Sequence, residues 1–222
     1  MKNKINKLDF SELSLVVLSS ESYSYLWGNF IKTWGKYCNN FVIKKFLITT
    51  NKNKNLKNFT ILSSGLDKDD FWSKRIKYAL KKIKSKNVLV FTDDCFMSET
   101  LDIHNFKKIY SEFKKKKILH LRLCPIPNED MLRKKNLYRL DYFSFHRISL
   151  QPSLWNKKFL EKMLSFDENP RMFEENGSIR SKKYSKIFST NYFVFDFIEI
   201  IRIGKVTPEG KKLIFKENLT LN

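Results

Sequence analysis

The sequence NVLVFTDD, residues 87–94, joins an apolar run of strand length directly to two adjacent aspartates. Such a continuous run is typical of a strand that is covered on both faces of a sheet. Its end places Asp93 and Asp94 at the carboxyl edge of the sheet, where open α/β folds bind ligands. Two carboxylates there are costly unless they bind a cation or hydrogen-bond donors. The stretch favours a site at which Mg²⁺ or Mn²⁺ bridges to a diphosphate; alternatively, the aspartates cap the following loop.

On either side of this stretch, strand patterns alternate with helix patterns. Apolar runs typical of strands occur at residues 13–19, 44–51, 59–64 and 118–123. Amphipathic or charge-polarised segments typical of helices occur at residues 23–38, 66–85 and 102–117. This alternation predicts an α/β fold, a three-layer sandwich with a mainly parallel central sheet.

The pattern changes in the second half of the chain. The segments there suggest an antiparallel hairpin or edge strands at 138–155, a short helix at 156–166, a polar loop with at most one helical turn at 167–184 and strands at 188–206. No internal repeat and no Pro/Gly/Ser-rich linker occurs in the sequence. We therefore expect a single domain over residues 1–222.

The chain is strongly basic. Its 222 residues include 43 Lys and Arg against 23 Asp and Glu, a formal net charge of +20. The basic clusters are spread over the whole chain, and the abundance of Lys, Asn, Ile and Phe is also what an AT-rich genome produces. Charge alone therefore leaves two interpretations open: solvated helix faces, or a polyanionic partner such as a nucleotide, a phosphorylated lipid or a nucleic acid.

Several classes of protein are disfavoured by missing motifs. The glycine patterns of the Rossmann fingerprint and the P-loop do not occur. The 3 cysteines are scattered without a C-x-x-C pair, which argues against a disulfide framework or a zinc knuckle and favours a reducing compartment. The apolar run Leu15–Leu18 is too short for a signal peptide or a membrane span. Because no recognition helix or RNP-type aromatic pattern appears either, we expect a cytoplasmic protein and no nucleic-acid partner.

Three short motifs follow one another in a fixed order. Trp72-Ser73 opens the helix before the acidic strand end, a Ser-Leu-Gln stretch at 149–151 precedes a short helix, and a Phe-Glu…Asn-Gly-Ser segment lies at 173–178. In this order they resemble the small bacterial glycosyltransferases of the GT-A class that act in surface-polysaccharide synthesis (lipopolysaccharide or capsule). Two features depart from the family pattern. The acids are adjacent rather than separated by one residue, and Arg171 stands where an aromatic residue is expected.

The resemblance implies a GT-A-like fold, a nucleotide-sugar donor and a Mn²⁺ or Mg²⁺ cofactor. Residues 1–125 would bind the nucleotide and residues 126–222 the acceptor. Asp94 and Asp93 would hold the metal. His146 would complete its shell, as a late histidine does in some GT-A enzymes, although a lone histidine on a strand is also commonly structural.

The donor would be bound mainly from the loop after the first strand and from the three motifs. The candidate donor-binding residues are Ser19, Ser20, Ser22, Trp72, Ser73, Asp93 and Gln151. For the three serines at 19–22, simple helix capping is an equally good interpretation.

Transfer to an acceptor hydroxyl with inversion needs a carboxylate as general base. Glu174 matches the position that the resemblance implies for that base, and Glu175 is the second candidate. The competing interpretation makes Glu174 a salt-bridge partner of Arg171 or Arg180 that merely orders the segment.

The acceptor implied by the resemblance is a glycan or a lipid-linked sugar, with the enzyme cytoplasmic or peripheral at the inner face of the cell membrane. The spread lysines would then aid weak association with an anionic membrane surface. A nucleotidyltransferase is the closest alternative, since it also joins paired acids to an α/β sheet. The segment SSESYSYLWG at 19–28 lacks the glycine-rich nucleotide loop that such enzymes need.

Overall fold

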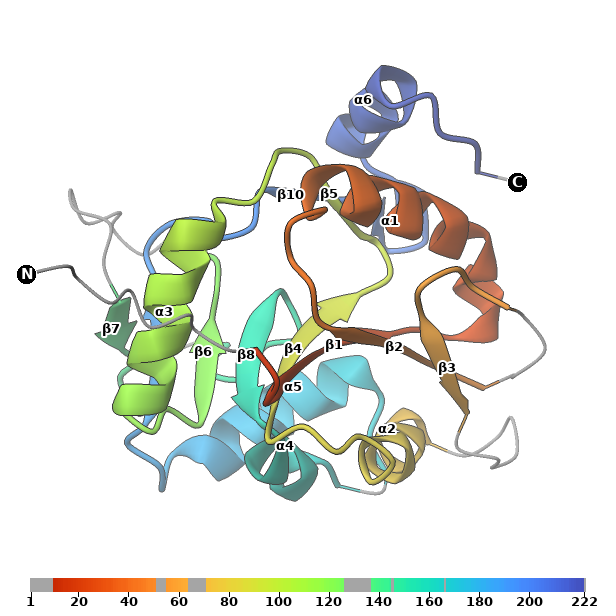
Figure 1. Cartoon of the computed structure of the whole chain (residues 1–222). Helices are drawn as coiled ribbons and strands as arrows, with labels where there is room; N and C mark the ends of the chain where they lie inside the picture. Colours follow the sequence, from red (N-terminus) through yellow and green to blue (C-terminus); the bar gives the residue numbers. More distant parts are fainter. Residues whose placement is uncertain are drawn as a thin grey trace, which may run out of the picture.

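An eight-stranded mixed sheet runs through the molecule (Figure 1). The computed structural model describes residues 10–50, 55–63, 71–125, 137–144, 146–165 and 167–221. Within these residues the strands of the large sheet are β1 (Leu13–Leu18), β2 (Lys44–Thr49), β3 (Thr60–Ser63), β4 (Asn87–Thr92), β6 (His120–Arg122), β7 (Leu137–Arg139), β8 (Ser153–Asn156) and β9 (Ile187–Thr190). Their order across the sheet is β3-β2-β1-β4-β8-β6-β9-β7.

The first four strands of that order, β3, β2, β1 and β4, are parallel to one another, as predicted. β1 pairs in parallel with both β2 and β4, and β2 pairs in parallel with β3. In the other half β6 and β9 are parallel, whereas β8 is antiparallel to β4 and β6, and β7 is antiparallel to β9. The expected α/β class with a mainly parallel sheet and an antiparallel C-terminal part is confirmed.

The prediction of a hairpin or edge strands over residues 138–155 is only partly correct. β7 is an edge strand, but β8 lies in the interior of the sheet, and the two do not pair. Leu154 and Trp155 on β8 are both completely buried, in the cores on opposite faces of the sheet. A strand that is covered on both faces belongs in the interior of a sheet.

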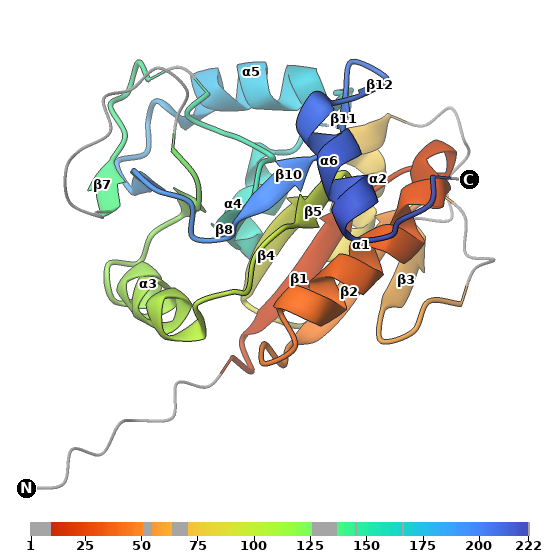
Figure 2. The same cartoon turned by 90° about the horizontal axis from the view of Figure 1, so that it is seen from above.

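Helices cover both faces of the sheet (Figures 1 and 2). On one face lie α1 (Ser24–Tyr37) and α3 (Ile103–Lys115), and on the other lie α2 (Trp72–Leu80), α4 (Lys157–Met163) and α5 (Pro170–Ser181). Successive residues of β1 alternate between the two cores: Leu15 and Val17 pack toward α1, and Val16 and Leu18 pack toward α2. This alternation explains why β1 is apolar throughout.

The segment predicted as a polar loop, residues 167–184, contains the helix α5 instead. The buried face of α5 consists of Phe173, Gly177 and Ser181, which are spaced four residues apart. A Cβ atom on Gly177 would lie 3.2 Å from Ile148 Cγ2, so glycine lets the helix approach that side chain closely. Because only one of the three buried residues is large and apolar, the hydrophobic period of this helix is almost invisible in the sequence.

Further short elements follow the sheet strands. They are the 3₁₀ turn η1 (Glu21–Tyr23), the paired strands β5 (Cys95–Met97) and β10 (Phe197–Glu199), the hairpin β11 (Ile201–Arg202) and β12 (Lys205–Val206), and the helix α6 (Pro208–Lys216). Strands within 188–206 were predicted, whereas β5 and α6 were not. The predicted helix over 66–85 begins at Trp72 in the described residues, and residues 64–70 lie outside them.

A buried carboxylate ties α2 to α5. The Ser73 hydroxyl accepts from the Glu168 N–H at 3.1 Å, and the Ser73 N–H donates to the Glu168 carbonyl at 3.1 Å. Arg180 on α5 donates to both oxygens of the Glu168 carboxylate, at 2.6 and 2.9 Å. Burial alone would raise the pKa of this carboxyl, but hydrogen bonds from Arg180, Ser165 and Asn176 outweigh it and keep the pKa below its usual value. Glu168 therefore joins the two helices, with its backbone bonded to Ser73 on α2 and its carboxylate paired with Arg180 on α5.

Candidate active site

A cleft of about 1080 Å³ opens at the carboxyl edge of the sheet, where β1 and β4 end. Its walls come from the segments after these two strands, the beginnings of α2 and α5, and the β11–β12 hairpin. The polar residues that line it are Ser19, Ser20, Tyr23, Arg75, Thr92, Asp93, Asp94, Asn169, Arg171, Glu174, Glu199 and Arg202. The edge is the one at which open α/β sheets bind ligands.

Asp93 lies at the floor of the cleft and is only 6% exposed. The Ser19 hydroxyl donates to Asp93 Oδ2, and the Trp27 indole N–H donates to Ser19 Oγ at 2.6 Å. The pKa of Asp93 is raised to about 7: burial is the main cause, the bond from Ser19 acts in the opposite direction, and the neighbouring Asp94 adds to the rise. Asp93 therefore changes its charge near neutral pH.

Asp94 is more open to the cleft and keeps one unsatisfied oxygen. Its Oδ1 atom is buried and has no hydrogen-bond partner among the described residues. Burial, and secondarily the nearby Glu199, raise the pKa of Asp94. A buried carboxylate oxygen without a partner is an atom that a bound cation would satisfy.

The donor set fits a metal that is shared with a ligand. Within the described ranges no three His, Cys, Asp or Glu side chains form a ready metal centre. Mg²⁺ is commonly held by one or two carboxylates together with substrate phosphates, so Asp94 and Asp93 suffice for the protein's share. The role of His146 as a third ligand stays a prediction.

The structure separates the two candidate bases. Glu174, on the face of α5 toward the sheet, lines the cleft, and its Oε1 accepts from the Leu150 N–H at 2.7 Å. Glu175 points away and forms an ion pair with Arg171, Nε to Oε1 2.8 Å, with its side chain 55% exposed. The salt bridge considered for Glu174 is therefore made by its neighbour, while Arg180 pairs with Glu168.

The remaining predicted donor-binding residues near the cleft divide into two groups. Ser20 and Trp72 line the cleft, and the Trp72 ring lies 5.6 Å from that of Phe173. Ser22 is exposed and its hydroxyl lies 2.6 Å from that of Ser20. Ser73 is completely buried in its bonds to the Glu168 backbone, so it supports the cleft wall from behind.

Gln151 and His146 line a second, smaller cavity of about 300 Å³. Gln151 Oε1 accepts from Arg122 Nη2 at 2.7 Å, and His146 is exposed with a left-handed backbone, φ 51°. The two cavities are neighbours, because both are lined by Thr92, Asp94, Leu150, Pro170, Glu174 and Glu199.

Several residues of the cleft were not predicted from the sequence. Glu199, at the end of β10, meets the aspartates because the Ile200 N–H donates to the Asp94 carbonyl at 2.8 Å. Arg75, Arg171 and Arg202 bring three guanidinium groups to the cleft, and guanidinium groups suit a diphosphate. Arg75 lies one helical turn after Trp72, a spacing that could have indicated a shared face; Glu199 has no comparable local signal.

Comparison with known proteins shows the fold. No family model matches the sequence, and no curated protein is similar to it. Residues 1–349 of TarS from S. aureus, solved in complex with UDP-GlcNAc, match 92% of this chain with a TM-score of 0.55 and 12% identity. The chain spans 65% of that fragment. HddC from Yersinia pseudotuberculosis matches 91% of this chain and 98% of its own, with a TM-score of 0.54 and 16% identity.

The chain therefore has the GT-A-like fold of these solved structures. The expectation of a GT-A-like fold is confirmed.

The pKa of Asp93 predicts a particular pH dependence of stability. The carboxyl has a pKa of about 7 in the folded protein and an ordinary value of 3.8. Below pH 3.8 it is protonated in both the folded and the unfolded chain, and its contribution to the free energy of unfolding is at its maximum. As the pH rises, only the unfolded chain loses this proton, and stability falls by roughly 1.4 kcal/mol per pH unit until the folded value is passed. Asp93→Asn should remove this loss, because an amide still accepts from Ser19 but does not ionise.

The measurement is urea unfolding of both proteins at about pH 4 and about pH 8. The free energy of unfolding of the variant relative to wild type should be clearly greater at the higher pH. Identical differences at both pH values would contradict a raised pKa of Asp93.

Proposed function

We propose that this protein is a glycosyltransferase that moves a sugar from a nucleotide-sugar donor to a hydroxyl of a glycan or lipid-linked acceptor in surface-polysaccharide synthesis. The observation that carries the proposal is the pair of neighbouring cavities with Asp94, Glu174 and Glu199 common to both. A donor in the cleft and an acceptor in the smaller cavity would meet at these carboxylates. TarS, a structure with the same fold, was solved with UDP-GlcNAc bound, which supports a ligand of that class.

In this proposal the cleft binds the nucleotide diphosphate. Asp94, with Asp93 beside it, would hold Mn²⁺ or Mg²⁺, which offsets the charge that develops on the leaving phosphate when it is bound. Arg75, Arg171 and Arg202 line the same cleft. Arg171 forms an ion pair with Glu175 and Arg202 with Glu199, so phosphate oxygens would share these guanidinium donors with the two carboxylates. The loop at Ser19 and Ser20 and the ring of Trp72 contact the rest of the donor. Residues 126–222 supply most of the lining of the acceptor cavity.

Glu174 is the proposed general base. The bond from the Leu150 N–H fixes one carboxylate oxygen, and the second oxygen accepts the proton of the acceptor hydroxyl. As this hydroxyl oxygen forms a bond to the anomeric carbon, the bond from that carbon to the diphosphate breaks and its electron pair leaves with the phosphate. Attack from the acceptor cavity, opposite the diphosphate, corresponds to inversion of the anomeric centre.

The proposal predicts metal-dependent binding of a nucleoside diphosphate. UDP or another nucleoside diphosphate with Mn²⁺ should raise the melting temperature of the wild type, since a ligand of the folded state stabilises it. Asp94→Asn should abolish transfer and lose the part of the shift that requires Mn²⁺, while melting normally without ligand. A screen of nucleotide sugars for release of nucleoside diphosphate then identifies the donor.

Two results would contradict this proposal. Release of pyrophosphate from a nucleoside triphosphate and a sugar phosphate would show a nucleotidyltransferase. Stabilisation by oligonucleotides instead of nucleoside diphosphates would show a nucleic-acid-binding protein.

The role of Glu174 predicts a loss of turnover without a loss of donor affinity. Glu174→Gln keeps the acceptor for the Leu150 N–H but removes the base, so kcat should fall by at least about 10²-fold with the donor KM nearly unchanged. Glu175→Gln on the next position of the same helix is the matched control and should turn over like the wild type. If Glu174→Gln is fully active and Glu199→Gln is not, the base is Glu199.

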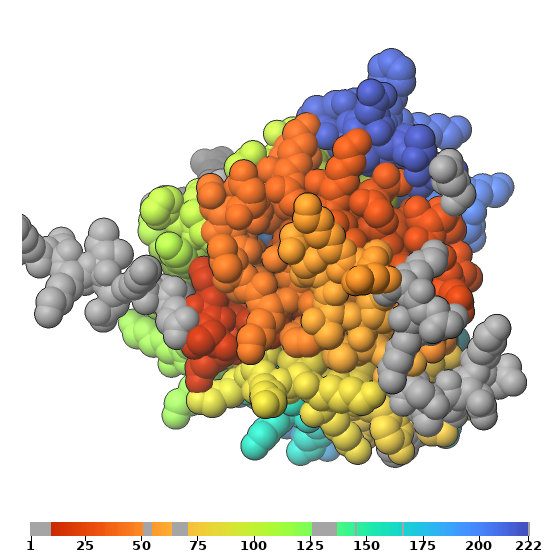
Figure 3. Space-filling view, turned by 45° about the vertical axis from the view of Figure 1, so that its right-hand side comes forward, coloured from red at the N-terminus to blue at the C-terminus, as the bar shows by residue number. Residues whose placement is uncertain are grey.

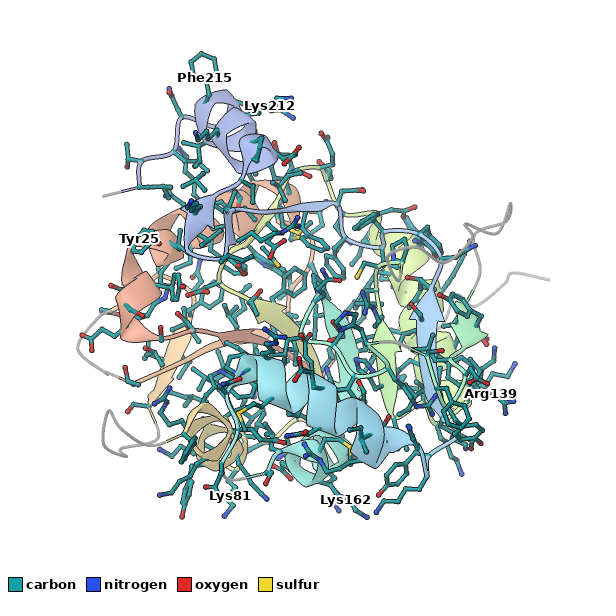
Figure 4. All side chains as sticks on the ribbon, turned by 180° about the vertical axis from the view of Figure 1, so that it is seen from behind. Tyr25, Lys81, Arg139, Lys162, Lys212 and Phe215 are labelled. Atoms are coloured by element: carbon teal, nitrogen blue, oxygen red, sulfur yellow. The ribbon has the colours of Figure 1, made fainter. Side chains whose placement is uncertain are left out.

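A lipid-linked acceptor would require the protein to reach a membrane surface. None of the helices in the described part of the chain has the length and apolarity of a membrane span. α6 projects from the rest of the surface (Figure 3) and presents Phe215, 89% exposed, near Lys212 (Figure 4). Lys211 and Lys216 belong to the same short helix. Ile203, 94% exposed, lies in the hairpin that lines the cleft and leads into α6. Exposed apolar residues among lysines are typical of docking to anionic lipid.

Vesicle co-sedimentation tests this surface. Lys211→Glu with Lys212→Glu should weaken binding to anionic vesicles severalfold at low salt and leave the weak binding to neutral vesicles unchanged. Lys81→Glu with Lys162→Glu is the matched control, because it changes the net charge equally on the opposite side of the molecule (Figure 4). Equal losses in the two variants would mean that α6 is not the docking surface.

A further inference from the structure

The smaller cavity contains a buried arginine without a counter-ion. Arg122, at the end of β6, is 2% exposed, and no described carboxylate forms an ion pair with it. Its Nη groups donate only to uncharged acceptors: Gln151 Oε1 at 2.7 Å, the Pro125 carbonyl at 3.3 Å, the His146 carbonyl at 3.4 Å and the Cys124 sulfur at 3.7 Å. Within the described part of the chain its Nε has no hydrogen-bond partner. A buried charge is costly unless it is paired, so this arrangement is incomplete as it stands.

The chain offers an internal comparison in Arg147, which is also completely buried. All three of its nitrogens are used: Nε donates to Ser181 Oγ at 3.0 Å, Nη1 to the Leu140 and Asp141 carbonyls at 2.7 and 2.6 Å, and Nη2 to the Tyr184 carbonyl. Arg147 lines neither of the two cavities at the sheet edge. Arg147 therefore joins neighbouring segments by hydrogen bonds, whereas Arg122 lies in a cavity wall and has one N–H group without an acceptor in the described ranges.

The charges around the smaller cavity are segregated. The acids Asp94, Glu174 and Glu199 lie where it adjoins the cleft, while Arg122 and Gln151 belong to the smaller cavity alone. An uncharged sugar would leave the Arg122 end uncompensated. A ligand with a hydroxyl at one end and an anionic group at the other would match both ends.

We propose that Arg122 binds a phosphate or carboxylate group of the acceptor, which makes the substrate class an anionic hydroxylated acceptor. This inference rests on the proposed function, since it takes the smaller cavity as the acceptor site. The guanidinium fork matches the oxygens of phosphate and carboxylate, and a charged acceptor oxygen binds it more strongly than the amide oxygen of Gln151 that now lies 2.7 Å from Nη2. With the anion held at Arg122, the acceptor hydroxyl would be directed toward Glu174.

The decisive variant is Gln151→Glu, which supplies a carboxylate to Arg122 from within the chain. It should melt at a higher temperature than the wild type without ligand, because the buried arginine gains a counter-ion. It should also bind added anions at least about tenfold more weakly, because the introduced carboxylate competes with them. Arg122→Met should lose anion binding as well. Arg147→Met, the matched control, should melt lower but keep the anion-induced shift.

The probes are inorganic phosphate and glucuronate, titrated by thermal shift in the presence of saturating nucleoside diphosphate and Mn²⁺ so that the cleft is occupied. A shift by either probe that disappears in Gln151→Glu supports the inference, and the more effective probe names the group. Equal shifts in wild type and Gln151→Glu, no shift with either probe, or a shift that vanishes once the nucleotide is bound would overturn it. If the nucleotide stabilises the protein but neither anion binds, the role of Arg122 is wrong and the proposed glycosyltransferase function stands. If the anions bind but no nucleotide has an effect, the glycosyltransferase function is wrong and the anion site at Arg122 stands.

Discussion

The parallel pairing of β1 with β4 is the constraint on which the site depends. Leu18 lies opposite Thr92, so the chain leaves both strands at the same edge and Ser19 meets Asp93 directly. Both strands are packed on both faces, and a slip of one residue would exchange the side chains that face the two cores. The register is thus fixed by burial, and with it the position of the carboxylates.

The same burial gives the two aspartates different properties. Asp93 has a hydrogen-bond donor supplied by the end of β1 and a pKa near neutrality, whereas Asp94 keeps a buried oxygen without a partner. One oxygen of Asp93 is thus held by the protein, whereas the unpartnered oxygen of Asp94 is the stronger candidate for contact with a cation. β10 adds Glu199 beside them through the bond between the Ile200 N–H and the Asp94 carbonyl.

Two other buried charged residues, Glu168 and Arg147, have their hydrogen-bond partners within the fold. Glu168 is surrounded by donors that join α2 to α5, and Arg147 uses all its nitrogens between loops. Arg122 differs, because it lines a cavity and its Nε has no acceptor among the described residues. Because Arg122 lies in a cavity wall, a bound ligand can reach the guanidinium group and supply the missing acceptor.

The sequence by itself determined the alternation of strands and helices in the first half and the position of the two aspartates at a strand end. These features follow from hydrophobic periods that are local, and β1, β4 and α1 carry them strongly. It also pointed to Glu174, through a motif rather than through a helix. The helix α5 was not predicted, because two of its three buried residues, Gly177 and Ser181, are small and give no apolar period in the sequence.

Only the tertiary structure decided which acidic side chains lie together at the two cavities. β8 enters the sheet between β4 and β6, and this insertion brings Leu150 to Glu174 and Gln151 to Arg122. Glu174 and Glu175 are adjacent in sequence, yet one lines the cleft and the other faces solvent, because consecutive helical residues point in different directions. Contacts between residues far apart in the chain depend on how the layers pack, and no local pattern in the sequence encodes that packing.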